Sequence, residues 1–182
     1  MIYKTHIATS LSLSLLPYSL GVISLNSQTE LFILLLLIPI FALMPDLDEP
    51  NSYLSRRTPI LPYIIRLFTK HRAFTHQLRA SFIFVLIPLL IINFFYLDVL
   101  VFIPGLFLAY VGHIIGDSFT VSGIRRFLYP ISNKTFYGLP KRFRFKTGSF
   151  FELFVVLPFM SALAALQVYK LVIIDFLTPL VS

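Results

Sequence analysis

Long apolar stretches constrain this chain more than any other feature of its sequence. They cover residues 7–25, 31–45, 78–97, 99–117 and 150–169. About 20 apolar residues are needed for a helix to cross the ~30 Å hydrocarbon core of a bilayer. With 57% hydrophobic residues, 13% charged residues and a mean hydropathy of +0.86, the chain is too apolar for a soluble domain. We therefore predict an all-α integral membrane bundle of about five transmembrane helices, forming one domain over 1–182.

The second stretch and the tail differ from an ordinary membrane-spanning helix in length. At ~1.5 Å per residue, residues 31–45 cover only about 22 Å. Either this helix extends back to Gln28, or the membrane thins around it. Residues 171–182 are apolar but too short to cross a bilayer, so they either continue the last helix or lie at the interface.

The basic residues indicate which way the helices run. Lys4 precedes the first stretch, and all the other lysines and arginines except Lys170 lie within 56–79 and 125–146. Cytoplasmic loops of membrane proteins retain lysine and arginine. We therefore predict a multi-pass protein with its N-terminus inside, cytoplasmic loops over 46–77 and 118–149, and its C-terminus outside.

This topology places the candidate metal ligands on the cytoplasmic face. The chain has no cysteine, so a metal ion would be held by imidazole, carboxylate or water. All the histidines and the main acids fall at the inner ends of the predicted helices or in the inner loops. They are His6, Asp46, Asp48, His71, His76, His113, Asp117 and Glu152.

The segment GHIIGD, residues 112–117, places His113 and Asp117 four residues apart, on one face of a helix. An imidazole and a carboxylate in this arrangement can bind one divalent ion. The alternative is a polar helix end at the interface, in which Asp117 only stops the helix. Ionisable groups near a bilayer are costly and usually functional, which favours metal binding.

Two further segments extend this pattern. In PDLDEPNS, residues 45–52, the turn imposed by Pro45 and Pro50 can direct both Asp46 and Asp48 at one ion. Alternatively, this segment is a solvated acidic turn that ends a helix. In KHRAFTHQL, residues 70–78, two histidines lie five apart, a spacing that favours one in the loop and one at the next helix start.

The remaining polar residues have a structural and a functional interpretation. Ser149 and Glu152 have the spacing of a helix capping box, and Glu152 is also a candidate general base. Arg56, Arg57 and Arg72 lie close to the acidic and histidine motifs and are candidates for binding phosphate. As an alternative, they anchor the loops to anionic headgroups. KRFRFK, residues 141–146, indicates an interfacial strip, and we expect no nucleic-acid binding.

Taken in order, PDLDEPNS, HRAFTH and GHIIGDSFTVSGI resemble the motifs of the bacterial inner-membrane metal-dependent hydrolase family, the YdjM-like proteins. The HxxxD element, His113 to Asp117, is also similar to those of zinc-dependent phospholipase C and P1-type nucleases. The resemblance implies a hydrolase in the bacterial inner membrane. Its implied metal ligands are His6, Asp46, Asp48, His71, His76, His113 and Asp117.

Seven nitrogen and oxygen ligands exceed the four of a tetrahedral zinc and suit two ions that share a carboxylate such as Asp46 or Asp48. We therefore expect two Zn²⁺, with Mn²⁺ or Mg²⁺ as alternatives, and Asp48, Glu152 and Arg72 as catalytic residues. The expected substrate is a lipid-linked or headgroup phosphoester at the cytoplasmic face, and membrane lipids are the expected partners. A divalent-metal transporter or a non-catalytic metal-binding membrane protein is the alternative; the sequence leaves the oligomeric state open.

Overall fold

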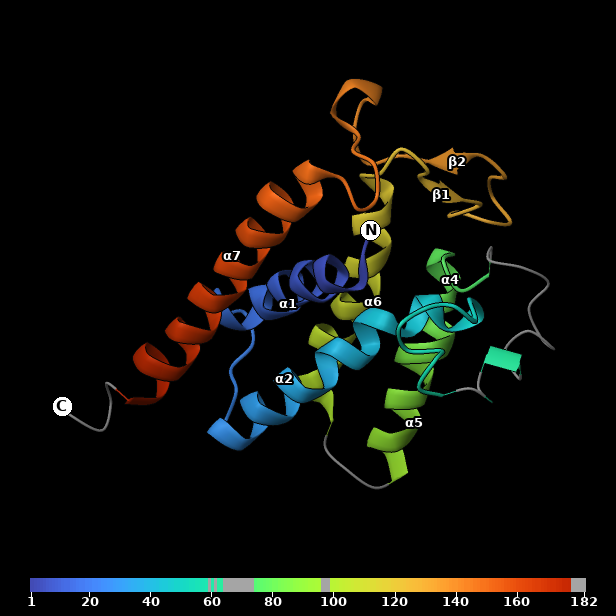
Figure 1. Ribbon diagram of the computed structural model, residues 1–182. Coiled ribbons are helices and arrows are strands. Elements are labelled where there is room, and N and C mark those ends of the chain that lie inside the picture. Colours follow the sequence, from blue (N-terminus) through green and yellow to red (C-terminus); the bar gives the residue numbers. More distant parts are fainter. Residues whose placement is uncertain (59, 61, 64–73, 96–98, 178–182) are drawn as a thin grey trace.

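The computed structural model describes residues 1–182 apart from 59, 61, 64–73, 96–98 and 178–182, and the described part is mostly helical (Figure 1). Helical segments occupy the positions of all the predicted stretches. In chain order they are α1 (Tyr3–Ser19); α2 (Gln28–Leu43) with the 3₁₀ turn η1 (Met44–Asp48); α4 (Leu78–Ser81), η2 (Phe82–Leu86) and α5 (Ile87–Phe95); η3 (Leu100–Phe102) and α6 (Ile103–Ser118); and η5 (Glu152–Val156), α7 (Leu157–Tyr169) and η6 (Lys170–Leu177).

Within the described residues, three continuous helices are long and apolar enough to cross a membrane: Gln28–Asp48, Leu100–Ser118 and Glu152–Ile173. The second predicted stretch reaches this length because α2 extends back to Gln28. The apolar helix Leu78–Phe94 is shorter. The first helix has 17 residues and ends at Ser19, six residues before the predicted end. The expectation of five full crossings therefore stays a prediction, while an apolar helical bundle is what the structure has.

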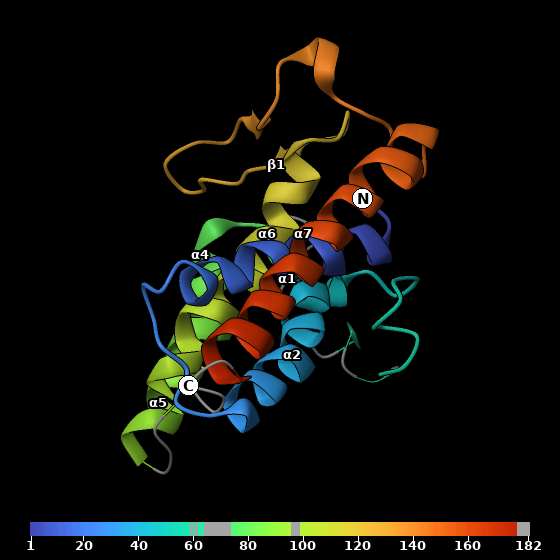
Figure 2. The same ribbon diagram turned by 90° about the vertical axis from the view of Figure 1, so that its left-hand side faces the viewer.

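Helix α1 lies in the middle of the bundle, where it contacts α2, α6 and α7 (Figures 1 and 2). Two of its serines find hydrogen-bond partners on the neighbouring helices. Ser10 donates a hydrogen bond to the carbonyl of Ala109 at 2.9 Å, and Ser12 donates to the carbonyl of Met160 at 2.8 Å. Gln167 on α7 donates to the carbonyl of Ser12 at 3.0 Å. These bonds fix α1 between α6 and α7.

Glycine allows α1 and α6 to approach each other closely. A Cβ atom at Gly112 would lie 3.0 Å from the Cα atom of Ser10, which is backbone and cannot move aside. Small residues at such positions let helices pack backbone to backbone in membrane proteins. The close approach brings His6 on α1 level with His113 on α6, whose rings stack with their centroids 3.6 Å apart.

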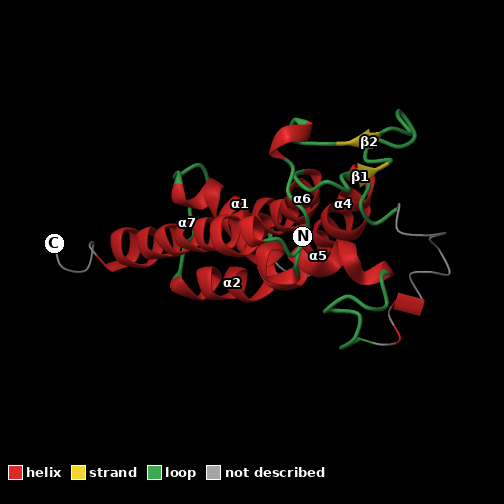
Figure 3. Cartoon of the chain, turned by 45° about the horizontal axis from the view of Figure 1, so that its top comes forward, coloured by secondary structure: helices red, strands yellow, loops and turns green. Residues whose placement is uncertain are grey.

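A short antiparallel ribbon is the exception to the expected all-α fold. Strands β1 (Ile124–Arg125) and β2 (Thr135–Phe136) pair with Arg125 opposite Thr135. Ile124 is buried and belongs to the apolar core, so it fastens the ribbon to the bundle. The 3₁₀ turn η4 (Lys141–Phe143) follows. Figure 1 shows the ribbon at the same end of the molecule as the N-terminus, beyond the last turn of α6, and Figure 3 shows its two strands in yellow.

The last helix continues past Tyr169 as the π-helical segment η6, to Leu177. Of the two arrangements open for the tail, the described residues therefore follow the helical continuation. Lys170, the lone basic residue outside the predicted inner segments, donates a hydrogen bond to the carbonyl of Ser19 at the end of α1.

Candidate metal centre

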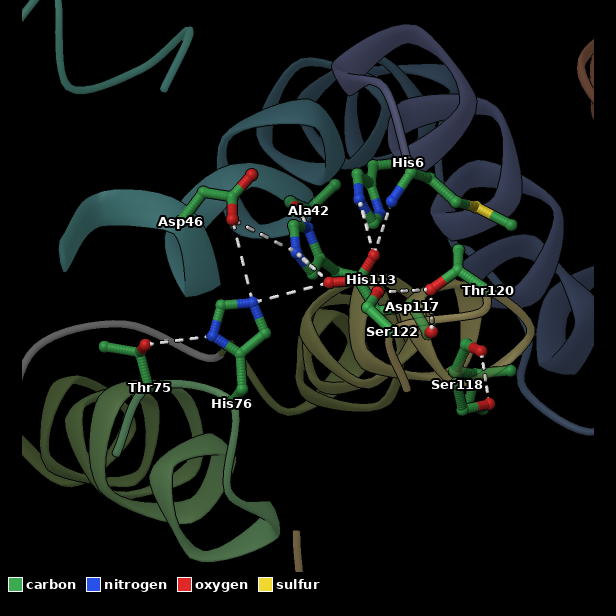
Figure 4. Close-up of polar contacts among 12 residues, drawn as sticks. His6, Ala42, Asp46, Thr75, His76, His113, Asp117, Ser118, Thr120 and Ser122 are labelled. Carbon is green, nitrogen blue, oxygen red and sulfur yellow. Dashed lines mark hydrogen bonds and ion pairs between the residues drawn. The ribbon is translucent and has the colours of Figure 1, made fainter. Parts of the chain in front are cut away.

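Three histidines and two aspartates from four segments of the chain converge (Figure 4). Their donor atoms form two overlapping groups, in each of which all atoms lie within 4.8 Å of one another. Helix α1 supplies His6, the turn η1 supplies Asp46, and the residues before α4 supply His76. The last turn of α6 supplies His113 and Asp117. Both groups include His113.

His113 has one nitrogen available for an ion. Its ring is fully buried, and Nδ1 lies 2.7 Å from the carbonyl oxygen of Ala42. A carbonyl only accepts, so Nδ1 carries the proton and Nε2 presents a lone pair. Nε2 has no hydrogen-bond partner among the described residues. It instead faces carboxylate oxygens of Asp46 at 3.6 Å and Asp117 at 3.7 Å, which are also acceptors when ionised.

Two imidazole nitrogens and two carboxylate oxygens lie close to one another. His76 Nε2 lies 3.6 Å from Asp46 Oδ1 and 3.5 Å from Asp117 Oδ2, and His113 Nε2 has nearly the same distances to the same two oxygens. In a tetrahedral zinc site with bonds of about 2.0–2.1 Å, neighbouring donor atoms lie about 3.3–3.4 Å apart. The four separations are close to that value, and His76, His113 and Asp117 form one close donor group, while Asp46 belongs to the other group with His6 and His113. A lone pair that faces two acceptors needs a cation or a donor between them.

The other oxygen of Asp117 points towards α1. Oδ1 lies 3.2 Å from His6 Nε2, and it also accepts a hydrogen bond from the amino group of Met1 at 2.5 Å. The two oxygens of Asp117 therefore face different histidines, with His6 on one side and His76 and His113 on the other. A carboxylate in this position is able to bridge two ions.

Several carboxylates lie near His76 and shift its pKa. Burial alone would lower its pKa, but the hydrogen bond and charge of Asp117, with the charges of Asp46 and Asp48, outweigh burial and raise the pKa above 6.5. His76 Nδ1 lies 3.2 Å from the hydroxyl of Thr75. Because a metal ligand must be neutral imidazole, protons compete with a metal at this position.

A pocket of about 380 Å³ opens onto the cluster. Its described lining residues are Asp46, Asp48, Glu49, His76, Asp117, Ser122, Gly123, Ile124 and Arg125. Asp48, predicted as a ligand and catalytic residue, is thus brought next to the cluster, although the two close donor groups do not include it. Glu49 and Arg125 were not singled out from the sequence. Arg125 is exposed on a strand of only two residues, which is too short to show a hydrophobic periodicity in the sequence.

Glu152 lies apart from the pocket-lining residues. It is fully buried, and its two carboxylate oxygens accept backbone N–H bonds from Ile2 and Gly148, both at 2.7 Å. Its own N–H donates to Ser149 Oγ at 3.4 Å. Of the two interpretations, these contacts are those of a helix cap that also holds the start of α1.

The predicted phosphate-binding arginines differ in their surroundings. Arg56 donates to the carbonyl of Asn51 at 3.0 Å, and Arg57 lies over the ring of Tyr53, 3.8 Å from its centroid. Neither is among the described residues that line the pocket. Two of the predicted site residues, His71 and Arg72, lie outside the described residues.

Comparisons with known proteins agree with the motifs. The model of the YdjM inner membrane protein family matches residues 1–179. The chain is 34% identical to YvsG of Bacillus subtilis (strain 168) over 115 residues, which cover 63% of this chain and 66% of that protein. It is 36% identical to the inner membrane protein YdjM of Escherichia coli (strain K12) over 89 residues, 45% of this chain and 42% of that protein.

The inner membrane protein YdjM of Shigella flexneri gives the same values. The aligned regions thus span less than two thirds of each of these relatives. No solved structure matches the chain. The resemblance drawn from the motifs is confirmed at the level of the family, since the family model covers nearly the whole sequence. This membrane protein therefore belongs to the YdjM inner membrane protein family.

Proposed function

We propose that the protein is a membrane-bound, metal-dependent hydrolase of a lipid or headgroup phosphoester. One observation carries the proposal. The buried Nε2 lone pair of His113 faces two carboxylates and a second imidazole at distances of a metal coordination sphere. A buried acceptor nitrogen that faces two carboxylates is unfavourable unless a cation lies between them.

The first ion in this proposal is held by His76, His113, Asp46 and the Oδ2 atom of Asp117. A second ion would take His6 and the Oδ1 atom of the same aspartate. The sequence favoured Asp46 or Asp48 as the shared carboxylate, whereas the directions of the two Asp117 oxygens favour Asp117. Because His113 has a single available nitrogen, it serves only one of the two ions. Zn²⁺ suits a site of imidazole and carboxylate, with Mn²⁺ as the alternative.

Bound metal at this position would lower the pKa of a coordinated water towards ~7 and polarise a phosphoryl oxygen. Asp48 lines the same pocket and is the carboxylate that we propose takes the proton. Glu152 is a weaker candidate because both of its oxygens already accept backbone hydrogen bonds. With the positive loops inside, the pocket would lie at headgroup depth on the cytoplasmic face.

The decisive experiment combines metal analysis with hydrolysis. The detergent-purified protein, as wild type and as His113→Gln, would be analysed for zinc, manganese and magnesium and assayed on phospholipids and lipid-linked phosphates. We expect stoichiometric metal and chelator-sensitive hydrolysis in the wild type and loss of both in the variant. Wild-type protein without metal refutes the proposal. Metal without hydrolysis but with uptake into proteoliposomes would favour transport.

A further inference from the structure

Arg125 stands out among the arginines that the structure describes. Each of the others donates a hydrogen bond from its side chain or lies over an aromatic ring: Arg56, Arg57, Arg79, Arg126, Arg142 and Arg144. Arg125 makes no such contact with any described residue, yet it lines the pocket beside the metal ligands. A guanidinium left uncommitted at the wall of an acidic pocket has its donors available for a ligand.

The backbone that presents Arg125 is built rigidly from the end of α6. Thr120 donates its hydroxyl proton to the carbonyl of Asp117 at 2.8 Å, so its oxygen accepts from Ser122 at 2.8 Å. The N–H of Val121 donates to the carbonyl of Phe145 at 3.0 Å. Gly123 has a φ of +60°, and a Cβ atom there would lie 2.5 Å from the ring of Tyr137. This turn ties the position of Arg125 to that of Asp117.

The hydrogen bonds of this turn also occupy other donors that could have bound an anion in the pocket. The hydroxyl proton of Ser122 is used on Thr120, and the N–H of Gly123 donates to the Thr120 carbonyl at 3.3 Å. The carboxylates of Asp46, Asp48, Glu49 and Asp117 repel an anion. Among the described lining residues, Arg125 is thus the one lysine or arginine and the one uncommitted strong donor. An anionic group that entered the pocket would find its charge-assisted hydrogen bonds there.

We propose that Arg125 forms a phosphoryl-binding subsite, in which its guanidinium holds the non-bridging oxygens of a phosphate group next to the metal cluster. This inference rests on the proposed function and deepens it. It assigns phosphate recognition to an arginine that follows the HxxxD element by eight residues, in place of Arg56 and Arg57. The planar guanidinium matches two phosphate oxygens, whereas a lysine would supply one point of contact.

The test measures binding of inorganic phosphate by calorimetry to the full-length, detergent-purified protein, with zinc and after treatment with a chelator. Metal content is determined on every sample. We expect Arg125→Gln to keep the wild-type metal content and to weaken phosphate binding at least about 10-fold, since hydrogen bonds between charged groups are the strong ones. Arg125→Lys should recover part of the loss. Arg126→Gln is the matched control, because its guanidinium lies over Tyr129, 6.0 Å from the ring centroid.

The outcomes separate the two proposals. Wild-type metal content with equal phosphate affinity in Arg125→Gln and Arg126→Gln overturns the Arg125 subsite and leaves the metal centre intact. Wild-type protein that binds no metal refutes the proposed hydrolase. In that case phosphate binding that is lost only in Arg125→Gln still supports the subsite, and no phosphate binding to the wild type overturns it.

Discussion

Replacing Asp117 with asparagine removes one negative charge from the centre of the cluster and leaves the shape of the side chain unchanged. The carboxylate of Asp117 lies 3.2, 3.5 and 3.7 Å from nitrogens of His6, His76 and His113. Altering groups that merely support metal ligands weakens metal binding 10- to 100-fold. On the proposed role of Asp117 as a direct ligand, its loss should weaken metal binding at least about 100-fold.

The size of the effect on stability follows from linkage. At a metal concentration of 100 times the wild-type dissociation constant, binding stabilises the folded state by about 2.7 kcal/mol. If Asp117→Asn raises that constant about 100-fold, the same metal concentration contributes only about 0.4 kcal/mol. The difference of about 2.3 kcal/mol would be measured by unfolding each protein with zinc and with a chelator, so that each serves as its own reference.

The control is Glu30→Gln, at the opposite end of α2, where the carboxylate accepts the N–H of Asn26 at 2.7 Å. This variant should retain the wild-type metal content and the full stabilisation by zinc. A folded Asp117→Asn variant that binds metal at the wild-type ratio, and gains as much stability from it as the wild type does, would contradict this prediction.

Three further predictions concern pH, the cap and the packing. The pKa of His76 is raised above 6.5, so protons already compete with a metal ion for this imidazole at pH values above 6.5. Titration calorimetry should therefore show that metal affinity falls progressively as the pH is lowered. A metal affinity that does not change between pH 5 and 8 would contradict this. Glu152→Ala should lower the free energy of unfolding by about 1–3 kcal/mol, since the partly buried N–H groups of Ile2 and Gly148 lose a charged acceptor. Metal content should stay unchanged; parallel loss of metal would instead make Glu152 part of the site. Gly112→Leu should cost about 1–3 kcal/mol by overpacking against Ser10, and an unchanged thermal transition would contradict the close packing of α1 and α6.

The sequence was sufficient for the parts of the site that depend on local geometry. The four-residue spacing of His113 and Asp117 fixes both on one helical face, and both point into the cluster. Pro45 ends α2 next to Asp46, as the turn motif indicated. Which oxygen of Asp117 faces which histidine depends on how α1, η1 and α6 pack together. Spacing along one segment carries no such information, so Asp117 was not recognised as the carboxylate between two groups of donors.

The bounds of the first helix and the arginine at the pocket were also not predicted from the sequence. Hydropathy predicted the first helix over 7–25, whereas α1 spans Tyr3–Ser19. Polar residues before Ile7 belong to the helix, and Ser10 and Ser12 donate hydrogen bonds to neighbouring helices, which hydropathy does not detect. The sequence suggested Arg56 and Arg57 because they lie near the acidic turn along the chain. Arg125 reaches the pocket through a ribbon that hydrophobic periodicity does not detect, because its strands have two residues each. The orientation in the membrane stays a prediction from the loop charges.

The change from α-helix to 3₁₀ turn at Met44 has a consequence for the chemistry of an imidazole on another helix. In the 3₁₀ register the donor for the Ala42 carbonyl would be the N–H of Pro45, and proline has none. That carbonyl accepts instead from His113 Nδ1 at 2.7 Å, which fixes the tautomer of the ring with Nε2 unprotonated. A missing backbone donor in the turn after α2 thus sets the protonation pattern of a side chain on α6 before any ion arrives. Pro45→Ala restores an N–H at this position. The backbone would then compete with His113 Nδ1 for the Ala42 carbonyl, and the tautomer of the His113 ring would no longer be fixed.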